Sequence, residues 1–250
     1  MTMLGQTVSQ NVNSTFLEVT PRTDITDVYR NLEGTELLAA VLGAEHFGEI
    51  AAVSSFGADS AVLLSLIVEV APSVPVIFLE TGKHFPETLD YVETIRRKLG
   101  LMEVRLIGPD PRDLSHSDLD GELWQSSTDT CCEVRKVVPL AKALKSFDSW
   151  ISGRKRFQGS DRSGIEAVEW TDGKFKINPL AHWTPDQIRS EFLTRNLPEH
   201  PLAAQNYPSI GCAPCTRPVD PGEDARSGRW PDSEKTECGI HKAPWYGANI

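Results

Sequence analysis

Four of the five cysteines in the chain stand in two pairs, and the fifth stands alone. Cys131 and Cys132 are adjacent, Cys212 and Cys215 form a C-x-x-C pair, and Cys238 lies near the C-terminus in the segment Glu-Cys-Gly-Ile-His. Thiolates are both metal ligands and nucleophiles. The division therefore predicts a metal centre held by four cysteines, with one thiol left free to react.

The spacing of the four paired cysteines bears on which metal they hold. Two C-x-x-C pairs are typical of zinc sites, but Cys131 and Cys132 are consecutive, and consecutive helical residues point about 100° apart. Both reach one centre more easily if the centre is large and offers ligand positions on separate iron atoms. A cubane 4Fe-4S cluster is such a centre, so we expect this cofactor, with zinc as the alternative.

Lys136 follows Cys132 by four residues and is expected on the same face of a helix. Its ammonium group would lie beside a centre made negative by its thiolates. The alternative is a solvated surface lysine, which is the commoner place for a single lysine.

Composition limits the class of protein. The chain has 250 residues, 40% of them hydrophobic, which suits one α/β domain or a domain with a small appendage. The first 25 residues lack the apolar run of a secretory signal, and the longest apolar stretch is too short to span a bilayer. We therefore expect a cytoplasmic protein without a membrane segment, in a compartment that disfavours structural disulfides.

The net charge of -10 argues against a nucleic-acid-binding protein, because such proteins neutralise phosphates. Two short basic clusters stand out against this acidic background and could form a pocket for a small anion. Their members are Arg154, Lys155, Arg156 and Arg162 in the first cluster, and Arg217, Arg226 and Arg229 in the second.

The hydrophobic pattern predicts strands and helices in alternation, which implies a parallel sheet flanked by helices. A hairpin is expected around Thr171-Asp172-Gly173. The expected strands are 49–54, 74–79, 102–107 and 149–153, and the expected helices are 35–44, 60–71, 85–99, 132–145 and 184–195.

Three parts of the chain are expected to differ in character. Residues 1–25 resemble a mobile N-terminal arm, residues 26–215 an α/β domain with the metal centre, and residues 216–250 an irregular C-terminal segment that carries Cys238.

Two loops follow the first two expected strands. The first, S-S-F-G-A-D-S at residues 54–60, joins a strand to a helix, a position where α/β proteins bind phosphate on backbone N–H groups. Alone, it would more often be structural, with Asp59 or Ser60 as a helix cap. The second loop, F-L-E-T-G-K-H-F-P-E-T, spans residues 78–88.

Together the two loops resemble those of the adenine nucleotide α-hydrolase superfamily and, within it, the sulfonucleotide reductases. That branch carries S-F-G-A-x-S followed by F-x-x-T-G-x-x-F-x-E-T and usually has Asp where this chain has Glu80. The segments C-C-x-x-x-K, G-C-A-P-C and E-C-G-I-H are similar to those of the assimilatory adenylyl-sulfate reductases in this family. The resemblance extends from about residue 35 to the C-terminus and implies a Rossmann-like, adenine nucleotide α-hydrolase-like fold.

The family resemblance also implies an activity in sulfate assimilation and cysteine biosynthesis. Cys238 would attack the sulfur of adenosine 5'-phosphosulfate, displace AMP and form an S-sulfocysteine. Thioredoxin or a glutaredoxin would then release sulfite by thiol exchange. Within the family the 4Fe-4S cluster has a structural and electrostatic role.

The resemblance assigns substrate-binding residues as well. Lys235, His241 and Lys242 lie near Cys238 in sequence and could stabilise its thiolate. The resemblance places Lys136, Arg162, Arg226 and Arg229 in the phosphosulfate pocket, Ser54, Ser55, Phe56, Gly57 and Ser60 in the nucleotide loop, Leu79, Thr81, Gly153 and Arg154 near the adenosine, and His241 among the substrate-binding residues.

Three other functions stay open at this point. A reductase of 3'-phosphoadenosine 5'-phosphosulfate typically lacks the paired cysteines. A zinc-containing nucleotide-binding protein without turnover would be colourless. An RNA-thiolating enzyme of the same superfamily fits the acidic charge poorly. The sequence leaves the oligomeric state undecided, a homo-oligomer included.

Overall fold

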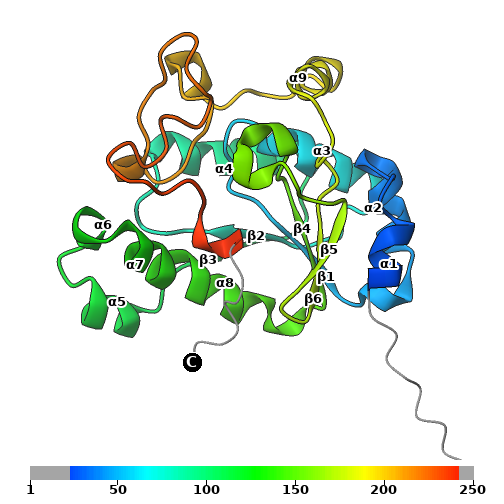
Figure 1. The fold of residues 1–250 in the computed structure, drawn as a ribbon, viewed down its shortest axis with the longest axis horizontal. Coiled ribbons are helices and arrows are strands. Elements are labelled where there is room, and N and C mark those ends of the chain that lie inside the picture. Colours follow the sequence, from blue (N-terminus) through cyan, green and yellow to red (C-terminus); the bar gives the residue numbers. More distant parts are fainter. Residues whose placement is uncertain (1–22, 242–250) are drawn as a thin grey trace, which may run out of the picture.

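A six-stranded sheet forms the centre of the molecule in the computed structural model, which describes residues 23–241 (Figure 1). The strand order is β3-β2-β1-β4-β6-β5, and all neighbours are parallel except β5 and β6. The strands are β1 (Ile50–Val53), β2 (Val76–Leu79), β3 (Val104–Ile107), β4 (Ser149–Ser152), β5 (Val168–Thr171) and β6 (Lys174–Ile177). This confirms the predicted α/β fold.

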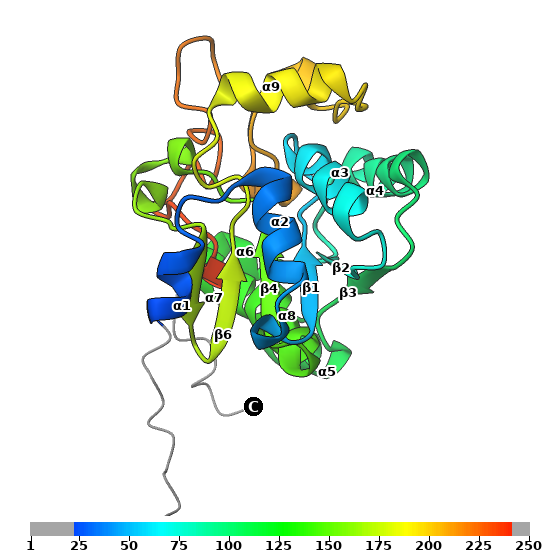
Figure 2. The same ribbon diagram turned by 90° about the vertical axis from the view of Figure 1, so that its right-hand side faces the viewer.

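Helices cover both faces of the sheet and extend beyond its ends (Figures 1 and 2). They are α1 (Thr23–Val28), α2 (Gly34–Leu42), α3 (Ser60–Val70), α4 (Pro86–Leu99), α5 (Pro111–Ser117), α6 (Leu123–Ser126), α7 (Thr128–Cys132), α8 (Val138–Ala143) and α9 (Pro185–Thr194). None of the helices within residues 23–241 combines the length and apolar character that crossing a bilayer requires.

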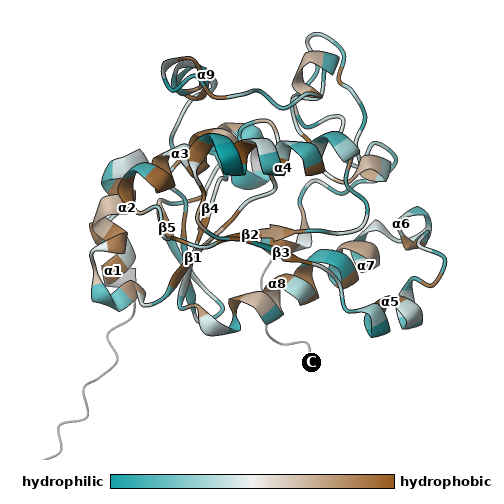
Figure 3. Ribbon diagram, turned by 180° about the vertical axis from the view of Figure 1, so that it is seen from behind, coloured by the Kyte–Doolittle hydropathy of each residue, from teal (hydrophilic) through white to brown (hydrophobic). Residues whose placement is uncertain are grey.

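The core is divided by the sheet into two apolar layers, as the alternation of side chains along β1 illustrates. Ala52 packs with α2, α3 and α4, whereas Ala51 and Val53 pack with α8. Buried on both faces, the central strands read as continuous apolar runs. In Figure 3 the apolar sides of α3 and α8 face the strands from opposite directions.

Local signals explain where several of these elements begin and end. Pro86 occupies the first turn of α4, and Gly100 ends it in the left-handed conformation. Thr184 and Gln187 form a capping box at the start of α9. Asp172 and Gly173, both with positive φ, make the two-residue turn of the predicted β5–β6 hairpin.

The predicted helix at 132–145 begins earlier and is not uniform. It starts at Thr128 as α7, widens into a π-helical segment at Glu133–Val137, and continues as α8. Such single π turns inside α-helices are frequently found at functional sites. The widened turn follows Cys131 and Cys132 directly.

Helix α1 begins at Thr23, within the last three residues of the predicted N-terminal arm, which stays a prediction. Residues 1–22 lie outside the described part of the chain. Helices α5 and α6 were not predicted. The division of the chain after residue 215 stays a prediction.

Candidate active site

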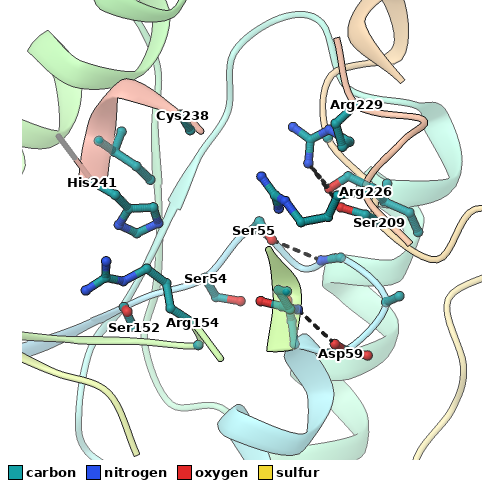
Figure 4. A pocket seen from close by; sticks show the side chains of 18 of the residues that line it. Ser54, Ser55, Asp59, Ser152, Arg154, Ser209, Arg226, Arg229, Cys238 and His241 are labelled. Carbon is teal, nitrogen blue, oxygen red and sulfur yellow. Dashed lines mark hydrogen bonds between the residues drawn. The ribbon is translucent and has the colours of Figure 1, made fainter. Parts of the chain in front are cut away.

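The main cleft opens at the carboxyl ends of β1, β2 and β4, with about 1220 Å³ of space between its walls, the mouth included (Figure 4). The strand order reverses between β1 and β4, and ligands of open α/β sheets bind at such reversal points. Its walls come from the loop after β1, the end of β2, the loop after β4, residues 208–211 and residues 226–241.

Most of the predicted substrate-binding residues meet in this cleft. Arg226 and Arg229 reach in from one side, Arg154 and His241 from the other, and Ser54 and Ser55 lie between them (Figure 4). The predicted residues that line the cleft are Ser54, Ser55, Gly57, Ser60, Leu79, Lys136, Gly153, Arg154, Arg162, Arg226, Arg229, His241 and Cys238.

The loop after β1 is held in shape by its own serines. The hydroxyl of Ser54 accepts a hydrogen bond from the backbone N–H of Phe56 (3.2 Å), and that of Ser55 accepts one from Gly57 (3.3 Å). Phe56 has a φ of 48°, which is rare for a bulky residue and typical of strained functional loops. A Cβ on Gly57 would lie 3.3 Å from the hydroxyl oxygen of Ser55, which is a tight contact, and 3.4 Å from the carbonyl oxygen of Ile210.

Two predicted residues lie behind the cleft wall rather than on it. Phe56 is fully buried and packs edge-to-face on Phe78, with ring centroids 5.4 Å apart. Thr81 is also fully buried, and its hydroxyl lies 3.4 Å from the sulfur of Cys212. Phe56 therefore anchors the loop from the core, and Thr81 belongs to the surroundings of the cysteines.

The cleft wall also contains residues that the sequence did not assign to substrate binding, among them Asp59, Lys155, Gln158 and Glu237. Asp59 makes no side-chain cap for α3. Its carboxylate pairs with Lys155 (3.0 Å) and accepts a hydrogen bond from Gln158 (3.2 Å). Asp59 and Glu237 stand within the motifs at residues 54–60 and 237–241, and Lys155 stands in the first basic cluster, whereas no motif contains Gln158.

Arg154 is fixed by polar groups of the neighbouring strands. Its guanidinium pairs with Glu169 of β5, and Asn178 donates to the same carboxylate (2.7 Å). Ser152 donates to Asn178 (2.7 Å). Burial, only partly offset by Glu169, lowers the pKa of Arg154. The network holds this arginine at the cleft edge.

A second, narrower cavity contains all four paired cysteines. We call it the cysteine cavity. Its lining comprises Cys131, Cys132, Cys212 and Cys215 together with Lys83, Trp124, Thr128, Arg135, Lys136, Pro214 and Trp230. The fold thus brings the two predicted pairs together. No group of three or more His, Cys, Asp or Glu side chains that could hold a metal ion is found within residues 23–241.

Hydrogen bonds and a buried ion pair hold the segments that carry the two cysteine pairs. The N–H of Ala213 donates to the carbonyl of Lys83 (2.8 Å), and the hydroxyl of Thr216 donates to that of Cys212 (2.9 Å). On the other side, Arg135 pairs with the fully buried Asp118 and also donates to the carbonyl of Thr81 (2.7 Å). Hydrogen bonds and the pairing lower the pKa of Asp118 despite its burial.

Lys136 lines both the main cleft and the cysteine cavity. Burial alone would lower the pKa of Lys136, but the nearby Cys212, Cys238 and Cys132 outweigh it and raise that pKa. Burial, followed by the charge of Cys212, raises the pKa values of Cys131 and Cys215. Lys136 is therefore the cation that joins the two sites, as its spacing from Cys132 predicts.

Cys238 is half-buried at the cleft, on a segment that follows Trp230. A hydrogen bond from Cys132 lowers the pKa of the Cys238 thiol well below its usual value despite burial, and Lys136 and Arg229 act in the same direction. The backbone N–H of Cys238 donates to Glu237 (2.8 Å). These contacts favour a thiolate that faces the cleft.

The expected thiolate stabilisers behave differently from one another. Lys235 pairs with Asp129 (2.6 Å) on α7. His241 stacks on Trp150 with ring centroids 5.8 Å apart, and burial together with Lys176 holds its pKa well below 6.5. His241 is therefore neutral near pH 7 and is not a cationic stabiliser. Lys242 lies outside the described residues.

Comparisons with known proteins agree with this geometry. Residues 49–218 match the family model described as phosphoadenosine phosphosulfate reductase domain. An adenosine 5'-phosphosulfate reductase of Mesorhizobium japonicum is 50% identical over 86% of this chain and 84% of its own length. An adenosine 5'-phosphosulfate reductase of Halalkalibacterium halodurans is 38% identical over 88% of this chain and 97% of its own length.

A further relative bears the other substrate's name. A phosphoadenosine 5'-phosphosulfate reductase of Gloeobacter violaceus is 41% identical over 78% of this chain and 83% of its own length. Among solved structures, a phosphoadenylyl-sulfate reductase of Candida auris superposes with a TM-score of 0.65 at 24% identity, covering 78% of this chain and 95% of the other. At that identity the likeness shows the fold.

Proposed function

This chain belongs to the phosphoadenosine phosphosulfate reductase family, and from that membership we propose that it reduces adenosine 5'-phosphosulfate to sulfite and AMP in sulfate assimilation. It is thus an oxidoreductase that acts on a sulfur group. The observation that carries the proposal is the meeting of a nucleotide loop, several arginines and Cys238 in one cleft.

The first step is nucleophilic displacement at sulfur. The thiolate of Cys238 attacks the sulfur atom of the phosphosulfate, and the bond from that sulfur to the bridging oxygen breaks. AMP leaves with the electron pair of this bond, and Cys238 becomes an S-sulfocysteine. Lys136, Arg226 and Arg229 offset the negative charge that an anionic nucleophile meets at an anionic substrate.

The second step consumes an external dithiol. One thiolate of the dithiol attacks the Cys238 sulfur, and sulfite departs with the electron pair of the S–S bond. The second thiol of the partner then displaces Cys238 as a thiolate, so the dithiol is oxidised to a disulfide while sulfate-level sulfur is reduced to sulfite. A thioredoxin or glutaredoxin of the cytoplasm suits this role, because reducing compartments keep such dithiols available.

The nature and number of the donors in the cysteine cavity support a 4Fe-4S cluster as the cofactor. Cys131, Cys132, Cys212 and Cys215 would hold it, one to each iron. Bound there, it supplies structural support and a negative charge beside the phosphosulfate site. If Cys132 held the cluster, its thiol would not donate to Cys238, and Lys136 and Arg229 would stabilise that thiolate.

Replacement of Cys238 by serine tests the mechanism. The C238S protein should bind the nucleotide and keep the visible absorbance of its cluster, but form no sulfonated enzyme when mixed with sulfur-labelled substrate. Wild type without dithiol should retain the label on the tryptic peptide Thr236–Lys242. Sulfite release by C238S would overturn the assignment of the nucleophile.

The preferred substrate needs a separate measurement, because one relative is named for the 3'-phosphorylated nucleotide. We expect kcat/KM to be higher for adenosine 5'-phosphosulfate than for its 3'-phosphorylated form. The two cysteine pairs favour this order, because reductases of the 3'-phosphorylated nucleotide typically lack them. A preference for the 3'-phosphorylated form would reverse the substrate assignment and leave the mechanism intact.

A further inference from the structure

Glu237, the residue before Cys238, is buried and makes a two-point ion pair with Arg162. The Nε and Nη2 atoms of Arg162 donate to the two carboxylate oxygens of Glu237, at 2.6 and 2.9 Å. Both side chains are about 10% exposed. Bidentate pairs of this kind are strong and geometrically specific. The pair joins the segment after β4 to the C-terminal segment, 75 residues later in the chain.

The same carboxylate also holds the neighbouring backbone. One oxygen of Glu237 accepts from the N–H of Cys238 (2.8 Å) and lies 3.6 Å from Arg226. Arg162 in turn donates its remaining nitrogen to Gln158 (2.6 Å). In this conformation every nitrogen of the Arg162 guanidinium is therefore engaged within the protein, and the position of Cys238 depends on Glu237.

The ion pair separates two cavities. On one side lies the main cleft, and on the other an outer cavity of about 790 Å³ that opens toward solvent. Arg162, Arg226 and Glu237 line both spaces. Parting Glu237 from Arg162 would thus open part of the wall between the outer cavity and the cleft that Cys238 lines.

We propose that Arg162 and Glu237 form a clasp, in which Glu237 is a positioning residue that holds Cys238 over the nucleotide and releases it to the dithiol partner when the pair opens. This inference rests on the proposed function. Cys238 must be a fixed, enclosed thiolate when it attacks the substrate, and its sulfur must be accessible when the partner's thiol attacks. The closed ion pair would provide the first state and the open ion pair the second.

A further hydrogen bond joins the same two segments next to the clasp. The hydroxyl of Thr236 bonds to Asp161, the residue before Arg162, so two consecutive residues of each segment meet. Lys235, whose side chain is 3% exposed, adds a pair with Asp129 on the far side, whose carboxylate is 79% exposed. Because Arg162 and Glu237 are both enclosed and bond at two points, whereas Asp129 is open to solvent, the pair between Arg162 and Glu237 should dominate the closure.

Alkylation of Cys238 measures the clasp without turnover. The full-length protein with its cysteine cavity loaded is treated with iodoacetamide in the absence of nucleotide, and modification is followed by mass spectrometry on the tryptic peptide Thr236–Lys242. Rates are compared at alkaline plateau, where the thiol is ionised in every variant. The variants are E237Q, R162Q and the double variant E237Q/R162Q.

We expect each single substitution to raise the alkylation rate about tenfold, the size expected for the loss of a charge-assisted hydrogen bond. The double variant should be no faster than either single one, because residues that act as a pair are non-additive. R162Q leaves the Glu237 carboxylate buried without its partner and could fail to fold for that reason. The double variant removes both charges, so it can be measured even if R162Q does not fold. The matched control is E166Q, whose exposed carboxylate pairs with Arg156 on the same segment (3.3 Å); its rate should match wild type.

Single-turnover kinetics separate positioning from general loosening. E237Q should slow formation of the sulfonated enzyme, yet leave the attack of dithiol on already sulfonated enzyme unchanged or faster. A merely structural defect would slow both steps. If wild type forms no sulfonated enzyme, the proposed function fails while the alkylation result still stands.

Two outcomes would overturn the clasp. One is an unchanged alkylation rate in E237Q and in the double variant, or rate increases that multiply in the double variant. The other is tighter binding of AMP by E237Q at an unchanged alkylation rate, which would make Glu237 an internal substitute for the substrate's anion rather than a clasp.

Discussion

The sheet region (residues 23–202) and the C-terminal arch (residues 203–241) are stabilised in different ways. Side chains of β1 and β2 are buried on both faces, in two apolar layers. The arch, at the top of Figure 1 and descending to the cleft, has isolated bridges such as Thr216 to Arg229 and short 3₁₀ turns. Its buried hydrophobic cluster is small and centres on Trp230.

Charged groups take the place of apolar burial in the arch. The cationic groups of Arg226, Arg229 and Lys235 lie over the Trp230 ring, at 5.9, 4.5 and 5.5 Å from its centroid. Trp230 also lines the main cleft, the cysteine cavity and the outer cavity. The sheet region therefore provides most of the apolar burial that stabilises the fold, whereas the arch contributes charged side chains and Cys238 to the cleft. Substitutions in the two regions should therefore have different readouts.

The largest effect on stability is expected in the sheet region, for Phe78→Ala. Phe78 lies on β2, is fully buried, and supports Phe56 beneath the nucleotide loop. The substitution should lower the free energy of unfolding by ~3–5 kcal/mol. Urea unfolding followed by circular dichroism measures it. Phe78→Leu is the control and should cost less than ~1.5 kcal/mol. A cost below ~1 kcal/mol for Phe78→Ala would break the comparison.

A pH-dependent effect is expected at His200, where the sheet region passes into the arch. Its Nδ1 accepts from the N–H of Leu202, and its Nε2 lies 3.1 Å from the Thr88 hydroxyl. Burial lowers the pKa of His200 to about 4. Between pH ~6.5 and ~4 the unfolded chain binds a proton that the folded chain excludes, so this histidine costs stability as the pH falls, by up to ~3 kcal/mol.

The measurement is urea unfolding of wild type and His200→Gln at several pH values across that window. As the pH falls, the unfolding free energy of wild type should decrease more than that of His200→Gln, because glutamine does not titrate. An unchanged difference between the two proteins from neutral to acidic pH would mean that His200 takes up a proton as readily in the folded protein as in the unfolded chain.

The smallest effect on stability, with a clear effect on activity, is expected in the arch for Arg229→Lys. Lysine keeps the charge but loses the planar donor array. The loss of one charge-assisted hydrogen bond to the substrate, ~1.5–3 kcal/mol, should lower kcat/KM by ~10–100-fold. Stability should change by less than ~1 kcal/mol.

Arg217→Lys is the matched control, because Arg217 is exposed and its pair with Glu223 is long, at 3.8 Å; it should keep wild-type kinetics. Equal losses of stability and activity in Arg229→Lys would erase the distinction between the regions.

Sequence patterns anticipated the sheet region because its signals are local. The period of apolar residues placed the strands and main helices within a few residues, and Asp172-Gly173 placed the hairpin turn. Helices α5 and α6 were missed because they are short and lack a buried face. Asp110 caps α5 with a single hydrogen bond from Arg112, a signal too common to predict a helix.

Motifs anticipated most of the cleft residues, but they did not predict the partner of each. Phe56 and Thr81 stand within motifs, yet the chain turns both away from the cleft. The pairs Asp59 with Lys155 and Arg162 with Glu237 join residues far apart in sequence. Such contacts depend on where two loops meet in space, and no local periodicity encodes that meeting.

The π-helical turn at Glu133–Val137 has a consequence for how this site tolerates length changes. A turn closed by i→i+5 bonds accommodates one more residue than an α-helical turn. Deleting one residue there would restore regular α-helix and rotate Cys131 and Cys132 by about 100° relative to α8. Leu140 and Ala141 hold α8 against the sheet, so the cysteine pair would turn instead. The cysteine site thus depends on chain length in this turn as strictly as on the cysteines themselves.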